Sequence, residues 1–232
     1  MLVTGGNRGI GLAIAEAFAG LGDQVAVTYR SDADLVPDGI LAVRCDVTST
    51  DDVDSLFTTV EEKHGPVQVL VSNAGITEDG LIMRMSDDAW ASVLDANLSA
   101  AFRVARRASR NMLKARSGRM IFISSITAYT GLPGQVNYAA SKSGLIGLSR
   151  SLAREFAPRG VTSNLVLPGF VETEMTAKLP QSRVDEIHGL IPLGRYGHAS
   201  EIAGAVTYLA SEPAAYVTGA VLTVDGGASM GH

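Results

Sequence analysis

The sequence predicts an α/β fold, in which an open, doubly wound parallel sheet of about seven strands carries helices on both faces. Short apolar runs rich in Val and Ile alternate with helical stretches along the chain. The runs are apolar at successive positions, which is typical of parallel strands that are covered on two sides. With 232 residues, 46% hydrophobic and 19% charged, the chain is long enough for one α/β domain, 1–232, with a large core.

The elements follow one another in a regular order. The expected strands are Leu2–Thr4, Gln24–Tyr29, Leu41–Arg44, Val67–Ser72, Met120–Ser124, Thr162–Leu167 and Ala220–Val224. The expected helices are Ile10–Leu21, Thr50–Lys63, Asp87–Ala115, Tyr138–Ala157 and Glu201–Ser211, and Pro158 and Gly160 end the fourth. In such sheets ligands bind at the carboxyl ends of the strands.

Composition excludes several functional classes. No run approaches the ~18 to 20 apolar residues of a membrane span, and no basic start precedes an apolar stretch, so we expect neither a span nor a signal peptide. A single cysteine, Cys45, fits a reducing cytosol, and we expect it to be a small buried residue rather than a nucleophile. A diffuse net charge of -5 argues against nucleic acid as a partner. The four histidines show no metal-ligand spacing, so we expect no metal.

A glycine-rich turn follows the first expected strand. It reads Thr4-Gly5-Gly6-Asn7-Arg8-Gly9-Ile10-Gly11 and leads into a helix. Glycines permit positive φ and close backbone approach, and the helix start offers free N–H groups to a pyrophosphate. An ordinary tight turn is the alternative, but a strand before it and a helix after it favour dinucleotide binding.

The end of the second expected strand bears on the choice between NAD and NADP. NAD sites usually place an acid there, about 20 residues after the turn, against the ribose 2′-hydroxyl. This chain has Arg30 instead, and Arg8 lies in the turn itself. Arginines suit a 2′-phosphate, so the sequence favours NADPH, although Asp32 and Asp34 follow closely. The alternative is that both arginines are plain surface residues.

Three residues form a candidate catalytic group. Tyr138 and Lys142 are four apart, which puts both on one helix face, and Ser125 follows the fifth expected strand. We expect the lysine ammonium and the positive charge of the oxidised nicotinamide to lower the pKa of the tyrosine toward neutrality. Ser125 would hydrogen-bond the substrate carbonyl. The Tyr–Lys spacing alone would be no more than a solvated helix face, whereas all three in this order behind a nucleotide turn are specific.

Taken together, these motifs resemble the short-chain dehydrogenase/reductases, a family with a Rossmann-like fold, over essentially the whole chain. The residues that carry the resemblance are the turn from Thr4 to Gly11, Asp46-Val47, Asn73-Ala74-Gly75, Asn97, Ser125, Tyr138, Lys142, Pro168-Gly169 and Asp225-Gly226-Gly227. The family's more common Asn-Asn-Ala-Gly is Ser72-Asn73-Ala74-Gly75 here.

The resemblance implies a role for each site residue. Asp46 and Val47 would contact the adenine, and Asn73, Ala74 and Gly75 would line the cofactor. Lys142 would bind the nicotinamide ribose, and Asn97 would hold a water that lets the tyrosine be reprotonated. Val171 and Thr173 would touch the nicotinamide carboxamide.

Within the family the chain resembles the 3-oxoacyl-[acyl carrier protein] reductases. The supporting stretches are 81–85, 134–142 and the close at 225–232, whose Met-Gly-His end is similar to the actinobacterial and mycobacterial branch. The implied activity is NADPH-dependent reduction of a 3-oxoacyl thioester on an acyl carrier protein in fatty acid elongation. Related enzymes act on acetoacetyl-CoA, polyketides, sugars or steroids, so those substrates stay open. A non-catalytic dinucleotide-binding protein is disfavoured because Ser125, Tyr138 and Lys142 are all present.

Three further expectations concern surfaces. The segment Val171–Leu193 contains Pro180 and Pro192 and breaks the strand–helix rhythm, which suggests a substrate lid. The resemblance implies a cytoplasmic homotetramer, and places Arg116 and Arg159 where these reductases present basic residues to the carrier. Met83 and Met85 fit either an acyl pocket or ordinary packing.

Overall fold

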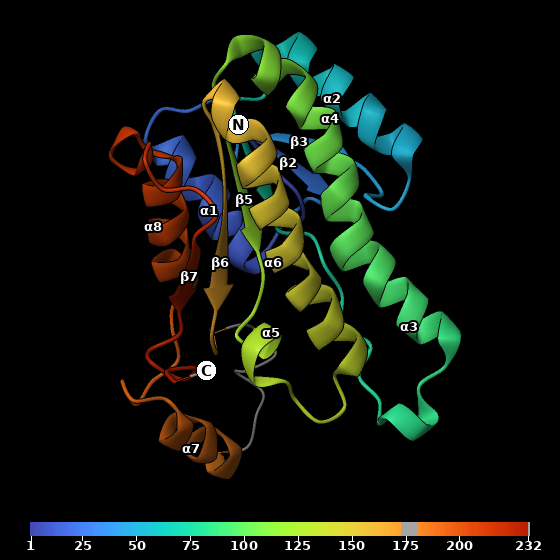
Figure 1. Ribbon diagram of the computed structural model, residues 1–232, viewed down its shortest axis with the longest axis vertical. Helices are drawn as coiled ribbons and strands as arrows, with labels where there is room; N and C mark the ends of the chain where they lie inside the picture. The colour runs from blue at the N-terminus through green and yellow to red at the C-terminus, as the bar shows by residue number, and fades with distance from the viewer. Residues whose placement is uncertain (173–180, 232) are drawn as a thin grey trace.

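A parallel sheet forms the centre of the molecule. The computed structural model describes residues 1–172 and 181–231 (Figure 1). The strands are β1 (Leu2–Val3), β2 (Ala26–Tyr29), β3 (Leu41–Arg44), β4 (Val69–Ser72), β5 (Gly118–Ile123), β6 (Val161–Pro168) and β7 (Val221–Val224). Their order is β3-β2-β1-β4-β5-β6-β7 and every pairing is parallel. The prediction of a doubly wound parallel sheet is confirmed.

Helices follow nearly every strand, as a parallel sheet requires. The longer ones are α1 (Gly9–Gly20), α2 (Thr50–His64), α3 (Asp87–Leu94), α4 (Ala100–Ala115), α6 (Val136–Phe156), α7 (Gln181–Leu190) and α8 (Ala199–Ala210), and α5 (Thr127–Thr130) is a single turn. Short 3₁₀ turns η1 (Ile82–Arg84), η3 (Ala157–Arg159) and η5 (Glu212–Ala214) link them. Pro158 and Gly160 end α6 as predicted, and Gly160 takes a positive φ of 68°.

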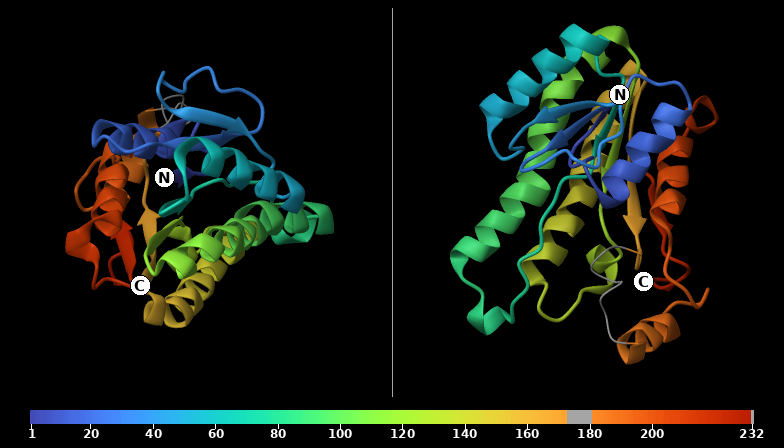
Figure 2. Two further views of the ribbon diagram at one scale, coloured as in Figure 1. Left: turned by 90° about the horizontal axis from the view of Figure 1, so that it is seen from above. Right: turned by 180° about the vertical axis from the view of Figure 1, so that it is seen from behind.

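The sheet separates two hydrophobic cores, because neighbouring residues of a strand point to opposite faces. Leu2, Leu70 and Phe122 pack on one face against α2, α4 and α6. Val3 and Val71 pack on the other face against α1 and α8. Figure 2 shows the two helical layers on either side of the sheet. Among the described residues, no helix is long and apolar enough to cross a membrane.

The predicted single helix Asp87–Ala115 is interrupted. A π-helical segment, η2 (Asp95–Ser99), lies between α3 and α4. A π turn contains one more residue than an α turn, so it changes which side chains face the core. Here it buries Asn97, which is 2% exposed.

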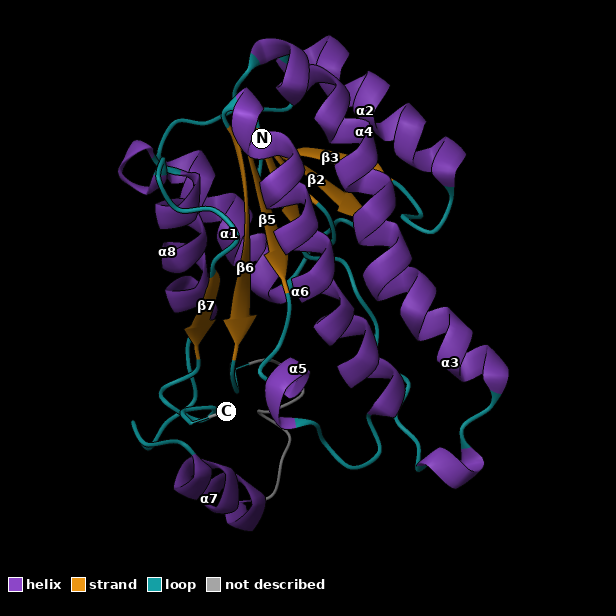
Figure 3. Cartoon of the chain, in the orientation of Figure 1, coloured by secondary structure: helices purple, strands orange, loops and turns teal. Residues whose placement is uncertain are grey.

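The predicted lid contains a helix that the sequence did not indicate. Helix α7 lies beyond the carboxyl ends of the strands (Figure 3). Its Ile187 packs with Ile191, Tyr196 and Phe170 in a small separate cluster. A parallel bridge joins Val171, at the start of the segment, to Gly197, four residues beyond its end. The residues 173–180, including Thr173, lie outside the described part of the chain.

Candidate active site

The glycine turn has the geometry that the sequence predicted. Gly5 and Gly9 adopt positive φ values of 62° and 54°, which strain any residue with a Cβ. A Cβ on Gly11 would collide with the carbonyl oxygen of Gly5. The chain therefore passes tightly from β1 into α1 and leaves backbone N–H groups at the start of the helix.

Hydroxyl and amide side chains fasten this turn to two neighbouring strands. Thr4 Oγ1 accepts from the backbone N–H groups of Asn73 and Ala74, both at 3.0 Å. Asn73 Nδ2 donates to the Thr4 and Gly5 carbonyl oxygens at 3.1 and 2.9 Å. Thr28 Oγ1, from β2, accepts from Gly5 N at 2.9 Å. Thr28 was not predicted as a site residue, because its only signal in the sequence is a hydroxyl inside an otherwise apolar strand.

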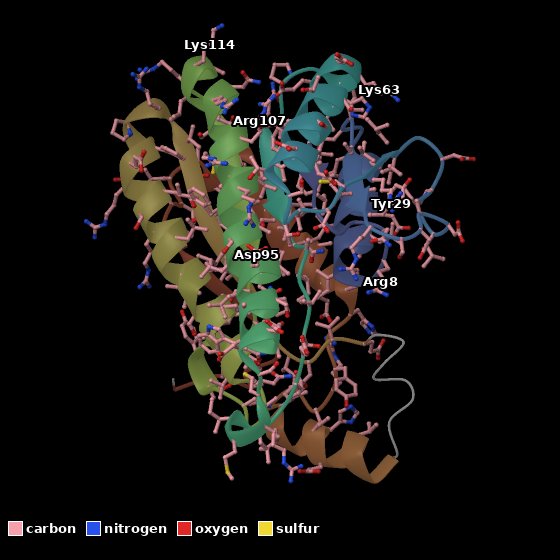
Figure 4. All side chains as sticks on the ribbon, turned by 90° about the vertical axis from the view of Figure 1, so that its right-hand side faces the viewer. Arg8, Tyr29, Lys63, Asp95, Arg107 and Lys114 are labelled. Carbon is pink, nitrogen blue, oxygen red and sulfur yellow. The ribbon has the colours of Figure 1, made fainter. Side chains whose placement is uncertain are left out.

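A cavity of about 380 Å³ opens beside the turn. Its walls include Arg8, Arg30, Asp46 and Val47, but neither Asp32 nor Asp34. Hydrogen bonds from the Thr48 hydroxyl and backbone hold the pKa of Asp46 below its usual range. Figure 4 shows Arg8 and Tyr29 on the same side of the molecule.

Cys45 lies in the wall of this cavity. Burial is the main cause that raises the pKa of its thiol to about 12, with Asp52 and Asp46 adding to the effect. A thiol with that pKa is a poor nucleophile. The prediction that Cys45 is a buried residue is confirmed, and the raised pKa disfavours a role as a nucleophile.

A second cavity, of about 600 Å³, continues from the first. The two share Arg8, Ile10, Asn73, Gly75 and Ile76 in their walls. Ser125, Tyr138, Lys142 and Val171 line the far part of the second cavity. All the residues that the sequence assigned to the cofactor line these two cavities, except Thr173, which is not described. An elongated ligand with a pyrophosphate in its middle, which is the form of a nicotinamide dinucleotide, fits this arrangement.

Ser125, Tyr138 and Lys142 are brought together from two elements. Ser125 follows β5, while Tyr138 and Lys142 lie on one face of α6. Lys142 is 4% exposed, its Nζ donates to the Ile123 carbonyl oxygen at 2.9 Å, and it lies 5.7 Å from the centre of the Tyr138 ring. Burial lowers the pKa of Lys142 to about 8.

The electrostatics of Tyr138 differ from the sequence expectation. We expected the lysine ammonium to lower its pKa. In the protein alone burial has the largest influence and raises the pKa, and Asp79 acts in the same direction, while a hydrogen bond with Ser125 lowers it. Any net lowering must therefore come from charge that arrives with a ligand.

Asn97 lies behind the catalytic group rather than in the cavity wall. Its Oδ1 accepts from Ile76 N at 2.8 Å, and its Nδ2 donates to the Ile76 carbonyl and to Ser141 Oγ, both at 3.0 Å. Ser141 Oγ in turn donates to the Tyr138 carbonyl oxygen at 2.8 Å. The π segment is thereby tied to the turn of α6 that carries the tyrosine.

The residues predicted to bind the carrier or the acyl chain do not line either cavity. Arg116 and Arg159 come together, since Arg116 donates to the Pro158 carbonyl at 3.0 Å, but they precede β5 and β6 and so lie at the amino edge of the sheet. Met83 is 93% exposed, and neither it nor Met85 lines the second cavity.

Four basic residues step along one face of α4, namely Arg103, Arg107, Arg110 and Lys114, and the first two of this stripe are in ion pairs. Arg103 pairs with Asp95 at 2.7 Å, and Arg107 binds both carboxylate oxygens of Glu61, at 3.0 and 2.8 Å. The first ion pair joins α4 to η2 and the second joins α4 to α2, so both arginines have a structural role within the protomer. The later residues of the stripe, Arg110 and Lys114, are exposed and can bind another partner.

Known proteins resemble the chain over its whole length. The model of the short-chain family described as "Enoyl-(Acyl carrier protein) reductase" matches residues 5–229. The chain is 52% identical to the 3-oxoacyl-[acyl-carrier-protein] reductase MabA of Mycobacterium avium, over 100% of this chain and 90% of that protein. Identity to MabA of Mycobacterium tuberculosis is also 52%, over 93% of that protein. It is 46% to the 3-oxoacyl-[acyl-carrier-protein] reductase FabG of Escherichia coli, over 99% of this chain and 96% of that protein. The chain therefore belongs to the short-chain dehydrogenase/reductase family of nicotinamide-dependent oxidoreductases.

Proposed function

We propose that the protein reduces the ketone of a 3-oxoacyl-[acyl carrier protein] to the 3-hydroxyacyl form with NADPH, as a step of fatty acid elongation. The observation that carries the proposal is the single cavity wall that holds Ser125, Tyr138 and Lys142 and continues into the dinucleotide cradle. The names of the relatives in mycobacteria and Escherichia coli support the substrate.

The chain's own residues supply the proton and hold the substrate. The dinucleotide, when bound, supplies the hydride that the carbonyl carbon accepts. The Ser125 hydroxyl hydrogen-bonds the carbonyl oxygen and so polarises the C=O bond. The Tyr138 hydroxyl gives its proton to that oxygen, which becomes the alcohol. Lys142, whose pKa of about 8 lets it exchange a proton near neutrality, assists the return of a proton to Tyr138.

The choice of NADPH rests on the charges beside the first cavity. Arg8 and Arg30 line it, and within residues 1–172 and 181–231 no ion pair holds either of them. Asp32 does not line this cavity. Its carboxylate accepts a hydrogen bond from Ser31 Oγ at 3.1 Å, and its backbone carbonyl accepts one from Asn7 Nδ2. Two free guanidinium groups favour a 2′-phosphate over a bare hydroxyl.

The description of the matching family model favours a second candidate, reduction of the C=C bond of an enoyl thioester. The two reactions differ in where the proton goes. Ketone reduction places it on the oxygen that receives negative charge, whereas enoyl reduction places it on a carbon. A tyrosine hydroxyl beside a second hydroxyl, Ser125, suits delivery to oxygen.

A substrate panel tests the proposal. We expect turnover of an acetoacetyl thioester with NADPH, slower turnover with NADH, and little with a crotonyl thioester or simple ketones. Tyr138→Phe keeps the ring and removes the hydroxyl, so it should bind NADPH and lose ~10² to 10⁴-fold in kcat. Faster turnover of the crotonyl thioester would favour the second candidate, and wild-type turnover in Tyr138→Phe would remove Tyr138 from the mechanism.

A further inference from the structure

The hydroxyl of Ser125 hydrogen-bonds the reactive Tyr138 on one side, and Thr127, two residues further along the chain, holds it on the other. The Thr127 backbone N–H donates to Ser125 Oγ at 3.2 Å, and the two side-chain oxygens lie 3.1 Å apart, with Ser125 as the donor. Among the described residues, Thr127 Oγ1 has no other hydrogen-bond partner. Its hydroxyl and its backbone N–H therefore both bind Ser125.

Thr127 sits on a rigid support. The Ile126 N–H donates to the Pro168 carbonyl at the end of β6, at 3.1 Å, and Ser143 Oγ from α6 donates to the Ala128 carbonyl at 2.8 Å. The short helix α5 is thus fastened on both sides of Thr127. A β-branched side chain also has a restricted χ1, so its hydroxyl stays beside the serine.

The Ser125 hydroxyl can accept two hydrogen bonds from Thr127 while it donates one to the substrate. A serine hydroxyl has one proton and two lone pairs. The Thr127 N–H occupies one lone pair. When Tyr138 and Ser125 both turn their protons toward a substrate carbonyl, the second lone pair of Ser125 is free, and the Thr127 hydroxyl can rotate and donate to it. Ser125 would then accept two hydrogen bonds while donating one, and hydrogen bonds in such a chain strengthen one another.

We propose that Thr127 is a positioning residue that fixes and polarises the Ser125 hydroxyl for its contact with the substrate carbonyl. The inference rests on the proposed ketone reduction, in which Ser125 touches the substrate and Thr127 acts through it. It assigns to Thr127 a share of the rate of the chemical step rather than a share of cofactor binding.

Thr127→Val tests this proposal, because valine keeps the shape and the backbone N–H and loses only the hydroxyl. We expect kcat to fall roughly two- to tenfold, the worth of one hydrogen bond, with dinucleotide affinity unchanged. Thr127→Ser, which keeps a hydroxyl, should restore most of the rate. Thr130→Val is the matched control, since it removes a hydroxyl from the same helix that bonds only backbone carbonyls of Ile126 and Gly131.

A double-mutant cycle separates positioning from a merely structural role. Once Ser125→Ala has removed the serine hydroxyl, adding Thr127→Val should cost no further kcat. An additive loss, an equal loss in Thr130→Val, or no loss in Thr127→Val alone would each overturn the proposal. The cycle can use whichever ketone the wild-type enzyme turns over, so a wrong thioester assignment would show in the substrate panel and leave the cycle interpretable.

Discussion

At the scale of the residue, Lys142 is the group in the site whose charge is most strongly disfavoured by burial. A fully buried ammonium loses its hydration, and a single hydrogen bond to the Ile123 carbonyl does not replace it. The resulting pKa of about 8 is useful for proton exchange, but it costs stability while the lysine is charged. Function and stability therefore oppose each other at this position.

This conflict predicts a pH-dependent stability difference between the wild type and Lys142→Met. Between the folded pKa of about 8 and the ordinary value of 10.5, the unfolded chain binds more protons than the folded one, so the lysine's penalty falls as pH rises. Lys142→Met should be the more stable protein at pH 7, and the wild type should regain up to about 3 kcal/mol by pH ~11. Urea unfolding across this range measures the gap, with the exposed Lys114→Met as the control. A gap that stays constant with pH would contradict the prediction.

The sequence revealed residues whose chemistry has a recognisable spacing. Ser125, Tyr138 and Lys142 stand at intervals set by one strand end and one helix face. Thr28 and Thr127 were missed, because a single hydroxyl that meets a backbone N–H has no pattern in the chain. Their importance appears only when the strands and turns are placed side by side.

At the scale of the element, the π segment η2 positions the site. Hydrophobic periodicity indicated one helix over Asp87–Ala115, and it could not reveal a one-residue change of phase. The helix α7 was missed for a similar reason, since its segment carries only scattered apolar residues. The sheet itself was predictable, because runs of Val and Ile with helices between them admit few other arrangements.

Removing the amide of Asn97 should loosen this element. Asn97→Ala leaves the N–H and the carbonyl of Ile76 and the hydroxyl of Ser141 without their partner in a buried place. We expect the free energy of unfolding to fall by about 2–4 kcal/mol. Asn111→Ala is the control. It removes a single side-chain hydrogen bond, from Asn111 Nδ2 to Glu61 at 2.8 Å, on the less buried side of the same helical stretch. Equal losses in the two variants would show that the π segment has no special role in stability.

The end of β2 should decide the cofactor. Arg30 follows this strand and lines the first cavity, and Arg8 lies across the turn from it. Arg30→Asp replaces a partner for a 2′-phosphate with a group that repels it. The ratio of kcat/KM for NADPH to that for NADH should fall steeply, and Arg8→Ala should lower it in the same direction. An unchanged ratio in both variants would place the 2′-phosphate pocket elsewhere.

At the scale of the whole molecule, the two edges of the sheet have different chemistry. The carboxyl edge holds both cavities, the catalytic residues and α7. The amino edge holds Arg116 and Arg159, roughly 20 Å away along the length of β5. If a carrier docks at the amino edge, its thioester must reach around the protomer or enter the site of another subunit. The predicted homotetramer would supply such a neighbour.

Charge reversal at the two edges distinguishes these routes. Arg116→Glu with Arg159→Glu should raise KM for a carrier-bound 3-oxoacyl substrate and flatten its salt dependence, because exposed charges mainly steer association and are screened by salt. A small acetoacetyl thioester needs no protein docking, so its KM should stay the same. Equal losses on both substrates would mean that these arginines serve folding or assembly.

Arg84→Glu is the matched comparison at the other edge. Arg84 is exposed on η1, in a loop that is joined to the start of α6 by the 2.8 Å hydrogen bond from Gly80 N to the Gly134 carbonyl, and so lies on the side of Tyr138. A carrier that docks at the mouth of its own protomer's cavity would lose affinity in Arg84→Glu and tolerate the changes at Arg116 and Arg159. We expect the reverse, with the KM of Arg84→Glu for the carrier-bound substrate close to that of the wild type. Arg116 and Arg159 are two exposed cations that the fold brings together, whereas Arg84 is surrounded by exposed apolar side chains. Measuring both variants on both substrates, at low and high salt, therefore locates the docking surface whichever edge it occupies.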